Sequence, residues 1–189
     1  MTEMKAYLDS IYELDDDLLR HYLSYWAPYA APRRTVITAP GEVEHYLYFV
    51  LEGVQKLYYM DDVKQHVLAF SYPPSFSGVI ESFFTQTASR YYLETVTKTR
   101  CLRIAWQDHQ RLMDEHRDIE RLFRKLTERF ILGMMQRHHE LMAFDMETRF
   151  RTFVARSPHL LGMVPQKDLA SYLRMDSTNF SKLINSVRI

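Results

Sequence analysis

A run of short polar side chains near the end of the sequence carries its most specific chemistry. Hydroxyl and amide groups can exchange hydrogen bonds with base edges, and an ammonium group can neutralise a phosphate. These groups lie on the outward face of a predicted helix that begins near Asp176: Ser177, Thr178, Asn179, Ser181 and Lys182. The pattern predicts a surface that can enter a groove of double-stranded DNA.

A second short helix is predicted just before this one and would hold it in place. Pro165 suits a first helical turn, and residues 166–173 carry three apolar residues on one face. The small Ala170 lets the two helices cross closely, while Met175 fills the angle between them. Together the two segments predict a helix–turn–helix. Two further DNA-binding residues are expected at its start, Gln166 and Lys167.

Arg174 occupies the position in this turn that glycine often takes. Either the arginine adopts a positive φ at some energetic cost, or the turn differs slightly. The alternative interpretation of both segments is a structural helical hairpin with a solvated polar face. Residues 145–189 carry seven basic and four acidic side chains, a net charge of +3, so the rest of the chain carries −3. This asymmetry favours the DNA-binding interpretation, but only weakly.

The middle of the chain predicts a β-structure. Between Arg33 and Ala105, short stretches rich in Tyr, Val, Leu and Phe alternate with Gly, Pro, Asp or Lys. This spacing indicates antiparallel strands in a sandwich or roll. Residues 18–26 before it have apolar residues at helical spacing, which predicts a helix packed on the roll.

Residues 107–143 predict one long helix that pairs with a second copy of itself. Apolar residues recur there at three- and four-residue steps, the pattern of a two-helix seam. Gly133 within it permits close backbone approach. The alternative is a single amphipathic helix buried on its own roll. The predicted dimer interface comprises Ile119, Leu122, Leu126, Phe130, Met134 and Leu141. A further helix is expected from Asp145 to Ser157, where Pro158 ends it.

Composition narrows the class of protein. With 189 residues, 47% of them apolar, and 24 basic against 24 acidic side chains, a folded chain of one or two domains is expected. The acidic N-terminus lacks the order of a signal peptide, and no apolar run approaches the ~20 residues that span a membrane. We therefore expect a cytoplasmic protein with no membrane partner.

Catalytic and metal-binding signatures are weak. His45 and His66 have no His-x-His pair or plausible third ligand nearby, so no metal site is predicted. The sequence lacks the nucleophile-elbow, phosphate-loop and dinucleotide-binding glycine motifs, and the single Cys101 has no activating neighbour in sequence. We expect no enzymatic activity and no catalytic residues.

The order of these zones resembles the Crp/Fnr family of bacterial transcription regulators. The resemblance covers nearly the whole chain, and its most specific pieces are GEVEHYLYFVLEG (residues 41–53) and VPQKDLASYL. It implies a homodimer that reads a near-palindromic DNA site, with RNA polymerase as an expected further partner. Family members usually continue past the recognition helix into a β-hairpin wing, so with the sequence ending at Ile189 the wing is expected to be short or absent.

The resemblance also implies an effector pocket in the roll. Its phosphate-binding segment corresponds to FSGVIESFFTQTASRYYLETV, in which Val79 replaces the expected acidic residue and bulky tyrosines follow Arg90. Two methionines stand where the family's adenine-binding hydroxyl pair would lie. The predicted pocket residues are Gly78, Val79, Glu81, Ser82, Arg90, Tyr91, Met134 and Met135. Because each departure weakens a nucleotide contact, we expect no tight binding of cyclic AMP. The roll then senses another, more apolar ligand or has a structural role only.

The resulting hypothesis has a defined architecture. An α+β chain carries an N-terminal antiparallel β-roll of the cyclic-nucleotide-binding type with the dimer helix (residues 1–143), followed by a helix–turn–helix domain (144–189). It is predicted to act as a dimeric, sequence-specific DNA-binding regulator. No cofactor is specified, and a small-molecule effector is left open. The alternative is a ligand-binding module of the same fold that has lost productive DNA binding.

Overall fold

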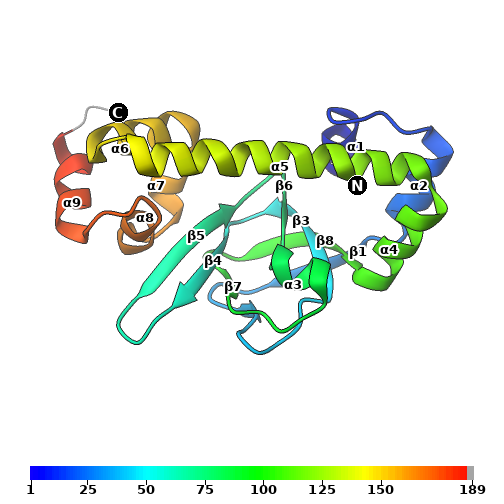
Figure 1. Ribbon diagram of the computed structural model, residues 1–189, viewed down its shortest axis with the longest axis horizontal. Helices are drawn as coiled ribbons and strands as arrows, with labels where there is room; N and C mark the ends of the chain where they lie inside the picture. The colour runs from blue at the N-terminus through cyan, green and yellow to red at the C-terminus, as the bar shows by residue number, and fades with distance from the viewer. Residues whose placement is uncertain (187–189) are drawn as a thin grey trace.

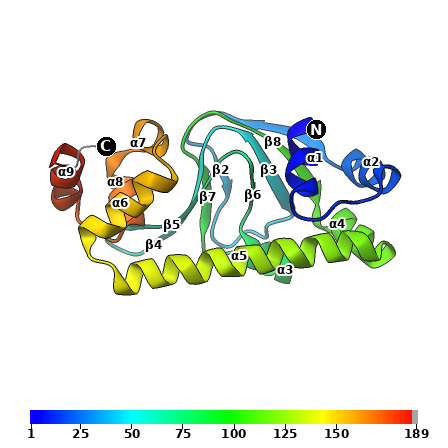
Figure 2. The same cartoon turned by 90° about the horizontal axis from the view of Figure 1, so that it is seen from above.

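A long helix organises the protein, which a computed structural model describes over residues 1–186 (Figures 1 and 2). This helix, α5 (Arg117–Ala143), runs past a β-roll with N-terminal helices at one end and C-terminal helices at the other. The arrangement confirms the predicted α+β class. The expected short or absent wing concerns the chain after Ser186 and lies outside the described residues.

Two four-stranded antiparallel sheets form the roll, with strand orders β1–β8–β3–β6 and β2–β7–β4–β5. Tyr48 and Cys101 of the first sheet pack against Leu93 and Leu57 of the second, so these faces enclose the interior of the roll. The short helix α3 (Ile80–Thr85) lies between β6 and β7. The strands are β1 (Ala27–Ala31), β2 (Val36–Thr38), β3 (Tyr46–Glu52), β4 (Gln55–Met60), β5 (Gln65–Ser71), β6 (Ser75–Ser77), β7 (Tyr92–Thr95) and β8 (Thr99–Ala105).

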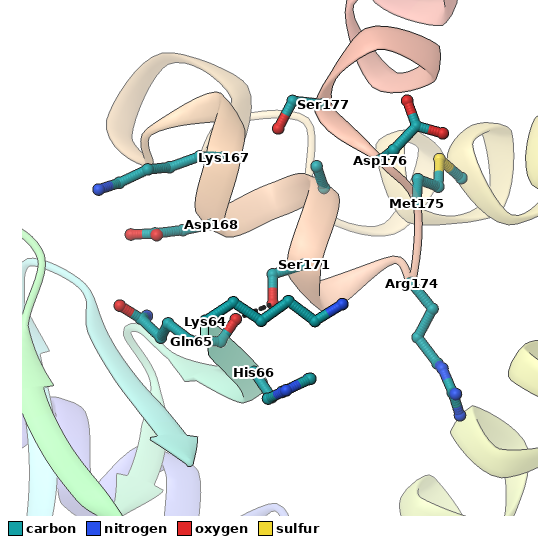
Figure 3. A pocket seen from close by; sticks show the side chains of 11 residues that line it. Lys64, Gln65, His66, Lys167, Asp168, Ser171, Arg174, Met175, Asp176 and Ser177 are labelled. Atoms are coloured by element: carbon teal, nitrogen blue, oxygen red, sulfur yellow. Dashed lines mark hydrogen bonds between the residues drawn. The ribbon is translucent and has the colours of Figure 1, made fainter. Parts of the chain in front are cut away.

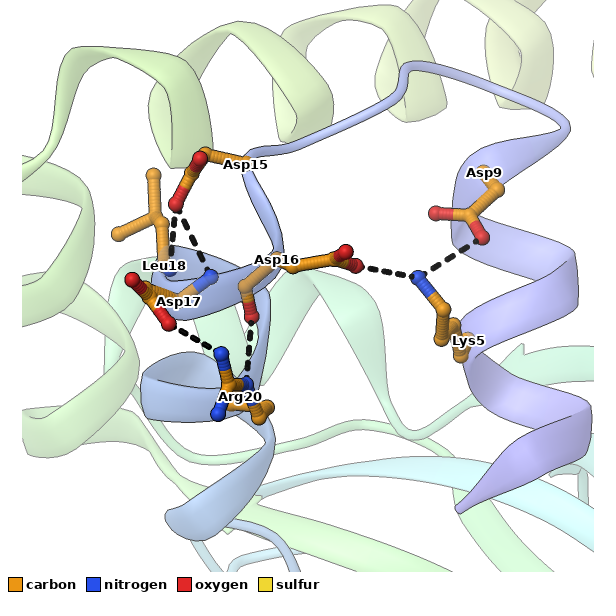
Figure 4. Close-up of polar contacts among 7 residues, drawn as sticks. All are labelled: Lys5, Asp9, Asp15, Asp16, Asp17, Leu18 and Arg20. Carbon is orange, nitrogen blue, oxygen red and sulfur yellow. Dashed lines mark hydrogen bonds and ion pairs between the residues drawn. The ribbon is translucent and has the colours of Figure 1, made fainter.

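The N-terminal helices α1 (Thr2–Asp9) and α2 (Asp16–Ser24) are held by local charge (Figure 4). Asp15 begins α2 by accepting hydrogen bonds from the backbone N–H groups of Asp17 at 2.9 Å and Leu18 at 3.3 Å. Lys5 joins the two helices, since its Nζ lies 3.3 Å from Asp9 and 3.1 Å from Asp16. The helix predicted from the apolar spacing of residues 18–26 is confirmed, and its buried face packs on the roll.

The predicted single helix over residues 107–143 is instead two helices, α4 (Trp106–Glu115) and α5. His116 between them is extended, with φ −131° and ψ 101°. The chain leaves β8 through α4 and must turn before α5 can run along the roll (Figure 1). Leu112 of α4 and Ile119 of α5 are both fully buried in the core beneath the N-terminal helices. Periodicity did not reveal this turn, because residues seven apart lie on the same face of a straight helix as well.

Four helices form the C-terminal unit: α6 (Met146–Arg156), α7 (Leu160–Met163), α8 (Gln166–Tyr172) and α9 (Ser177–Ser186). Asp145 caps α6 by accepting from the N–H of Thr148 at 2.8 Å, and α6 ends before Pro158 as predicted. Phe150 and Phe180 form a T-shaped pair in the core of the unit, with ring centroids 5.6 Å apart. That core continues into the roll through Val54 and Val96, so the unit packs directly on the sheets.

Candidate functional site

The predicted helix–turn–helix is confirmed as α8, a tight turn and α9. Arg174 has φ 53°, the positive value that the sequence offered as one of two outcomes. The backbone N–H of Met175 donates to the carbonyl of Ala170 at 2.9 Å, which closes the turn over the small residue. A left-handed conformation costs a non-glycine residue about 1 kcal/mol or more, so packing between the helices must stabilise the turn.

The outward face of α9 carries the predicted DNA-binding residues. Ser177, Thr178 and Lys182 are exposed, while Asn179 and Ser181 are half-buried. Asp176 caps α9 by accepting from the N–H of Asn179 at 2.8 Å, and the Asn179 side-chain amide also donates to Asp176. Asn179 is therefore held by its own helix start. At the first turn of α8, Gln166 and Lys167 are exposed.

The helix α8 is fastened to the roll by a buried ion pair. Lys56 of β4 and Asp168 of α8 lie 3.1 Å apart, with side chains that are 8% and 6% exposed. Ser171 adds two hydrogen bonds along β5, accepting from the N–H of Val67 at 2.9 Å and donating to the carbonyl of Gln65 at 3.0 Å. Sequence reasoning missed these contacts because the paired residues are more than 100 positions apart.

The end of α5 is joined to the same unit. The guanidinium of Arg137 lies 3.5 Å from the ring centroid of Tyr172 at the end of α8, and burial lowers the pKa of Arg137. Arg156 of α6 pairs with the buried Glu140 of α5 at 2.9 Å. Burial alone would raise the pKa of Glu140, but hydrogen bonds from Arg156 and Gln136 outweigh it, so the pKa is lowered. The helix–turn–helix thus has fixed contacts to both α5 and the roll.

A groove of about 700 Å³ lies where the β4–β5 hairpin meets the helix–turn–helix (Figure 3). Lys64 and His66 reach it from the hairpin, and Lys167 and Arg174 from the helical side. Two carboxylates, Asp168 and Asp176, also line it, but Asp168 is already paired with Lys56. The free charge beside the start of α9 is therefore mainly positive.

In the predicted phosphate-binding segment, the arginine forms an ion pair within the segment itself. Gly78 has φ +142°, as a tight approach before α3 requires. Arg90 points outward and pairs with Glu81 at 2.8 Å, and both side chains are largely exposed. Ser82 is buried, and its hydroxyl accepts from the N–H of Glu44 at 2.9 Å. The charged groups of the segment thus bond to one another or to the fold.

A carboxylate of the protein lies beside the start of α3. Glu44 is 2% exposed and accepts hydrogen bonds from the hydroxyl of Thr38 at 2.7 Å and from the N–H groups of Tyr46 at 3.1 Å and Val79 at 3.4 Å. Burial raises the pKa of Glu44, and these donors offset part of that rise. Val79 packs in the interior of the roll beside Tyr48, while Tyr91 is half-buried at its edge.

The interior of the roll also contains the single cysteine, packed beside Val50 and Leu93. Burial raises the pKa of the Cys101 thiol to about 12, so the reactive thiolate is scarce near neutral pH. Among residues 1–186, no three side chains of His, Cys, Asp or Glu are grouped as metal ligands. None of the helices in that range is long and apolar enough to cross a membrane.

The members of the predicted dimer interface differ in accessibility. Ile119 and Leu122 are fully buried within the protomer, and Leu126 packs against the same core. Leu141 is half-buried, whereas Phe130 and Met134 are more than half exposed. The middle of α5 presents an apolar surface in which each side chain is at least half exposed: Phe130, Ile131, Leu132, Met134 and Met135. The two methionines predicted for the effector pocket therefore lie on this surface.

Comparison with known proteins agrees with this geometry. The family description "Cyclic nucleotide-binding domain" matches residues 30–116. No curated protein sequence matches the chain. Two of the solved structures that resemble it are those of a global regulator and a catabolite activator protein, which are named as regulators and not as enzymes.

Three of the similar structures extend over most of the chain. FixK2 from Bradyrhizobium japonicum has a TM-score of 0.71 and 16% identity, over 85% of this chain and 83% of that one. The c-di-GMP-responsive regulator CLP from Xanthomonas campestris has a TM-score of 0.65 and 18% identity, over 90% of each chain. The catabolite activator protein of Thermus thermophilus has a TM-score of 0.58 and 18% identity, over 93% of this chain and 84% of that one. Residues 30–116 thus form a cyclic nucleotide-binding domain, and the chain has the fold of the Crp/Fnr family of transcription regulators.

Proposed function

We propose that this protein is a dimeric regulator that binds specific DNA sequences through α9. The observation that carries the proposal is the polar outer face of α9, presented on a helix–turn–helix that is fixed to both α5 and the roll. Ser177, Thr178 and Lys182 are free to reach base edges and phosphates. A regulator of this kind acts at promoters in the bacterial cytoplasm, with RNA polymerase as a partner.

The dimer would form along the exposed apolar surface of α5. Residues 130–135 there gain from burial against a second copy, since a large apolar surface is costly in water. In this proposal Ile119 and Leu122 support the seam from inside the protomer, and Phe130 and Met134 form it. Two copies would then present two α9 helices to half-sites about 34 Å apart on the DNA.

Cyclic AMP is a poor candidate for the effector. Arg90 pairs with Glu81 at the surface, and the Glu44 carboxylate accepts the N–H of Val79 beside α3. A cyclic phosphate brought here would meet a buried acidic group and no free arginine. Isothermal titration that gave micromolar cyclic-AMP affinity, lost in Arg90→Ala, would overturn this part of the proposal.

The DNA-binding proposal is tested by selecting genomic fragments with the purified protein at about 150 mM salt, near physiological ionic strength. The expected result is an inverted repeat whose enrichment collapses in Lys182→Ala, because a phosphate or base contact is lost. Lys98→Ala is the matched control, since Lys98 is an exposed lysine on the roll. Equal, motif-free recovery with all three proteins would contradict the proposal.

The alternative function is a ligand-binding module that does not use DNA. It is favoured by one observation, the docking of α8 on β5, because a docked unit can serve as a structural cap for the roll. Salt dependence separates the two functions, since each phosphate contact contributes about −0.9 to the log–log slope of affinity against salt. A slope near zero would favour the ligand-binding module.

A further inference from the structure

The roll contains a hollow that none of the predicted effector residues lines. Its volume is about 480 Å³, and it is lined by residues of β1, β2, β3 and β8 and of the loop before β3. Half of its lining residues are aromatic or aliphatic: Tyr29, Tyr46, Tyr48, Ile37 and Val43. The other half are polar or charged: Thr38, Glu42, Glu44, His45 and Arg103. Apolar side chains that surround a small number of polar groups are typical of small-molecule sites, and here the polar share of the lining favours a ligand with a polar end.

One cation lies in this hollow. Arg103 of β8 is half-buried, and its guanidinium carbon is 4.1 Å from the ring centroid of Tyr46 and 4.7 Å from that of Tyr29. Both distances are within the range of cation–π attraction, an interaction that does not use up the N–H donors of a guanidinium. Arg103 is thus preorganised but not neutralised by these contacts.

Arg103 differs from Arg100 on the same strand in having no carboxylate partner among the described residues. Arg100 at the other end of β8 pairs with Glu52 at the surface. Within residues 1–186, Arg103 forms no such ion pair. A half-buried guanidinium without a carboxylate partner retains its capacity for a two-pronged bond to an oxyanion.

Two carboxylates also line the hollow, and they limit the charge of a ligand. Glu44 is occupied by its three internal donors, and Glu42 accepts from the N–H of Ala39 at 2.8 Å. Neither bonds to Arg103, but both repel additional negative charge. A ligand with one anionic end and an uncharged body therefore fits better than a polyphosphate.

We propose that this hollow binds a small organic monocarboxylate, with its carboxylate on Arg103 and its apolar body against Tyr29, Tyr46 and Ile37. No residue of the Glu81–Arg90 segment lines the site, although Glu44 in its wall bonds to Ser82 of that segment. The proposal assigns a class of ligand to the sensor roll. Its regulatory part, that this ligand controls DNA binding, rests on the proposed function. Ligand binding itself requires neither DNA nor a dimer.

A series of packed contacts joins the hollow to α5. Glu44 accepts from Val79, which immediately precedes α3. Phe83 of α3 lies 5.8 Å from the ring of His109, whose ring lies 4.4 Å from that of Phe123 on α5. A ligand that shifts the loop carrying Glu44 would therefore act on the packing of α5.

Isothermal titration of the full chain tests the proposal, with benzoate and hexanoate as aromatic and aliphatic probes. Both should bind in a saturable manner, and phenyl phosphate more weakly, at constant ionic strength. Arg103→Gln should weaken benzoate binding about 10- to 100-fold, the loss expected for a charge-assisted bond. Arg100→Gln, on the same strand but at the surface, should leave the affinity unchanged.

One further variant separates binding from folding. Arg103→Lys keeps the charge and loses the planar fork, so it should fold normally and bind benzoate with intermediate affinity. Absence of saturable binding of either probe to the wild type, or equal affinity in Arg103→Gln, would overturn the proposal. If the wild type binds benzoate but no specific DNA, the proposed function is contradicted and the carboxylate site is still supported. Benzoate binding without any change in DNA affinity would remove only its regulatory role.

Discussion

The ion pair between Lys56 and Asp168 is the most deeply buried charged contact between the roll and the helix–turn–helix, and Asp168→Ala tests how firmly it holds them together. The two groups lie 3.1 Å apart and are 8% and 6% exposed. Removing one member of a buried pair typically destabilises a protein by about 3–5 kcal/mol, because the remaining charge stays desolvated without its partner.

Glu94 reduces the expected cost of this substitution. Its carboxylate lies 3.8 Å from Lys56 and remains in Asp168→Ala, so part of the attraction is kept. We therefore expect a loss of about 2–3 kcal/mol in the free energy of unfolding, below the full range for an orphaned charge. The double variant Lys56→Met/Asp168→Leu leaves neither charge of the pair buried and should recover part of that loss, because Glu94, which is 17% exposed, then loses its own cation.

Urea unfolding followed by circular dichroism measures both changes through the transition midpoint and the slope. Glu147→Ala is the control, because it removes an exposed pair with Arg151 on α6 and should change the stability little. An unchanged midpoint in Asp168→Ala would show that the pair contributes nothing. A double variant as unstable as the single one would refute the argument from desolvation.

Three further predictions concern the turn, a buried histidine and α5. Arg174→Gly should stabilise the protein by up to about 1 kcal/mol in thermal unfolding, because glycine adopts φ 53° without strain; a decrease would mean that the Arg174 side chain contributes more than its backbone costs. Burial lowers the pKa of His109 to about 4, so the unfolded chain takes up this proton near pH 6.5 before the folded one does. Stability should therefore fall by up to about 3 kcal/mol as the pH drops from 6.5 to 4, and urea unfolding of His109→Leu should lack this fall while the exposed His138→Gln keeps it. Met134→Asp should dissociate the dimer in sedimentation velocity, whereas Thr127→Asp on the same helix should not; a dimer that persists in Met134→Asp would remove this residue from the seam.

The sequence by itself determined the features that depend on local interactions. Apolar spacing located α6 and α9, because a helical face involves residues only three or four apart. The structure then showed that Asp145 and Asp176 cap these two helices. The turn at Arg174 followed in the same way from the crossing of α8 and α9 over Ala170. The order of a β-roll followed by helices was predictable, because apolar residues recur with a different period in strands and in helices.

Only the tertiary structure decided which side chains meet across long stretches of chain. Lys56 and Asp168 are 112 positions apart, and neither residue type signals burial by itself. The same limit applies to Arg90, which matched a phosphate-binding pattern but turns outward to Glu81, and to Arg103, which no pattern singled out. The spacing of residues in the sequence predicts which face of a helix or strand each residue occupies. The packing of the two sheets and α5 decides whether that face meets solvent, another charge or a hollow.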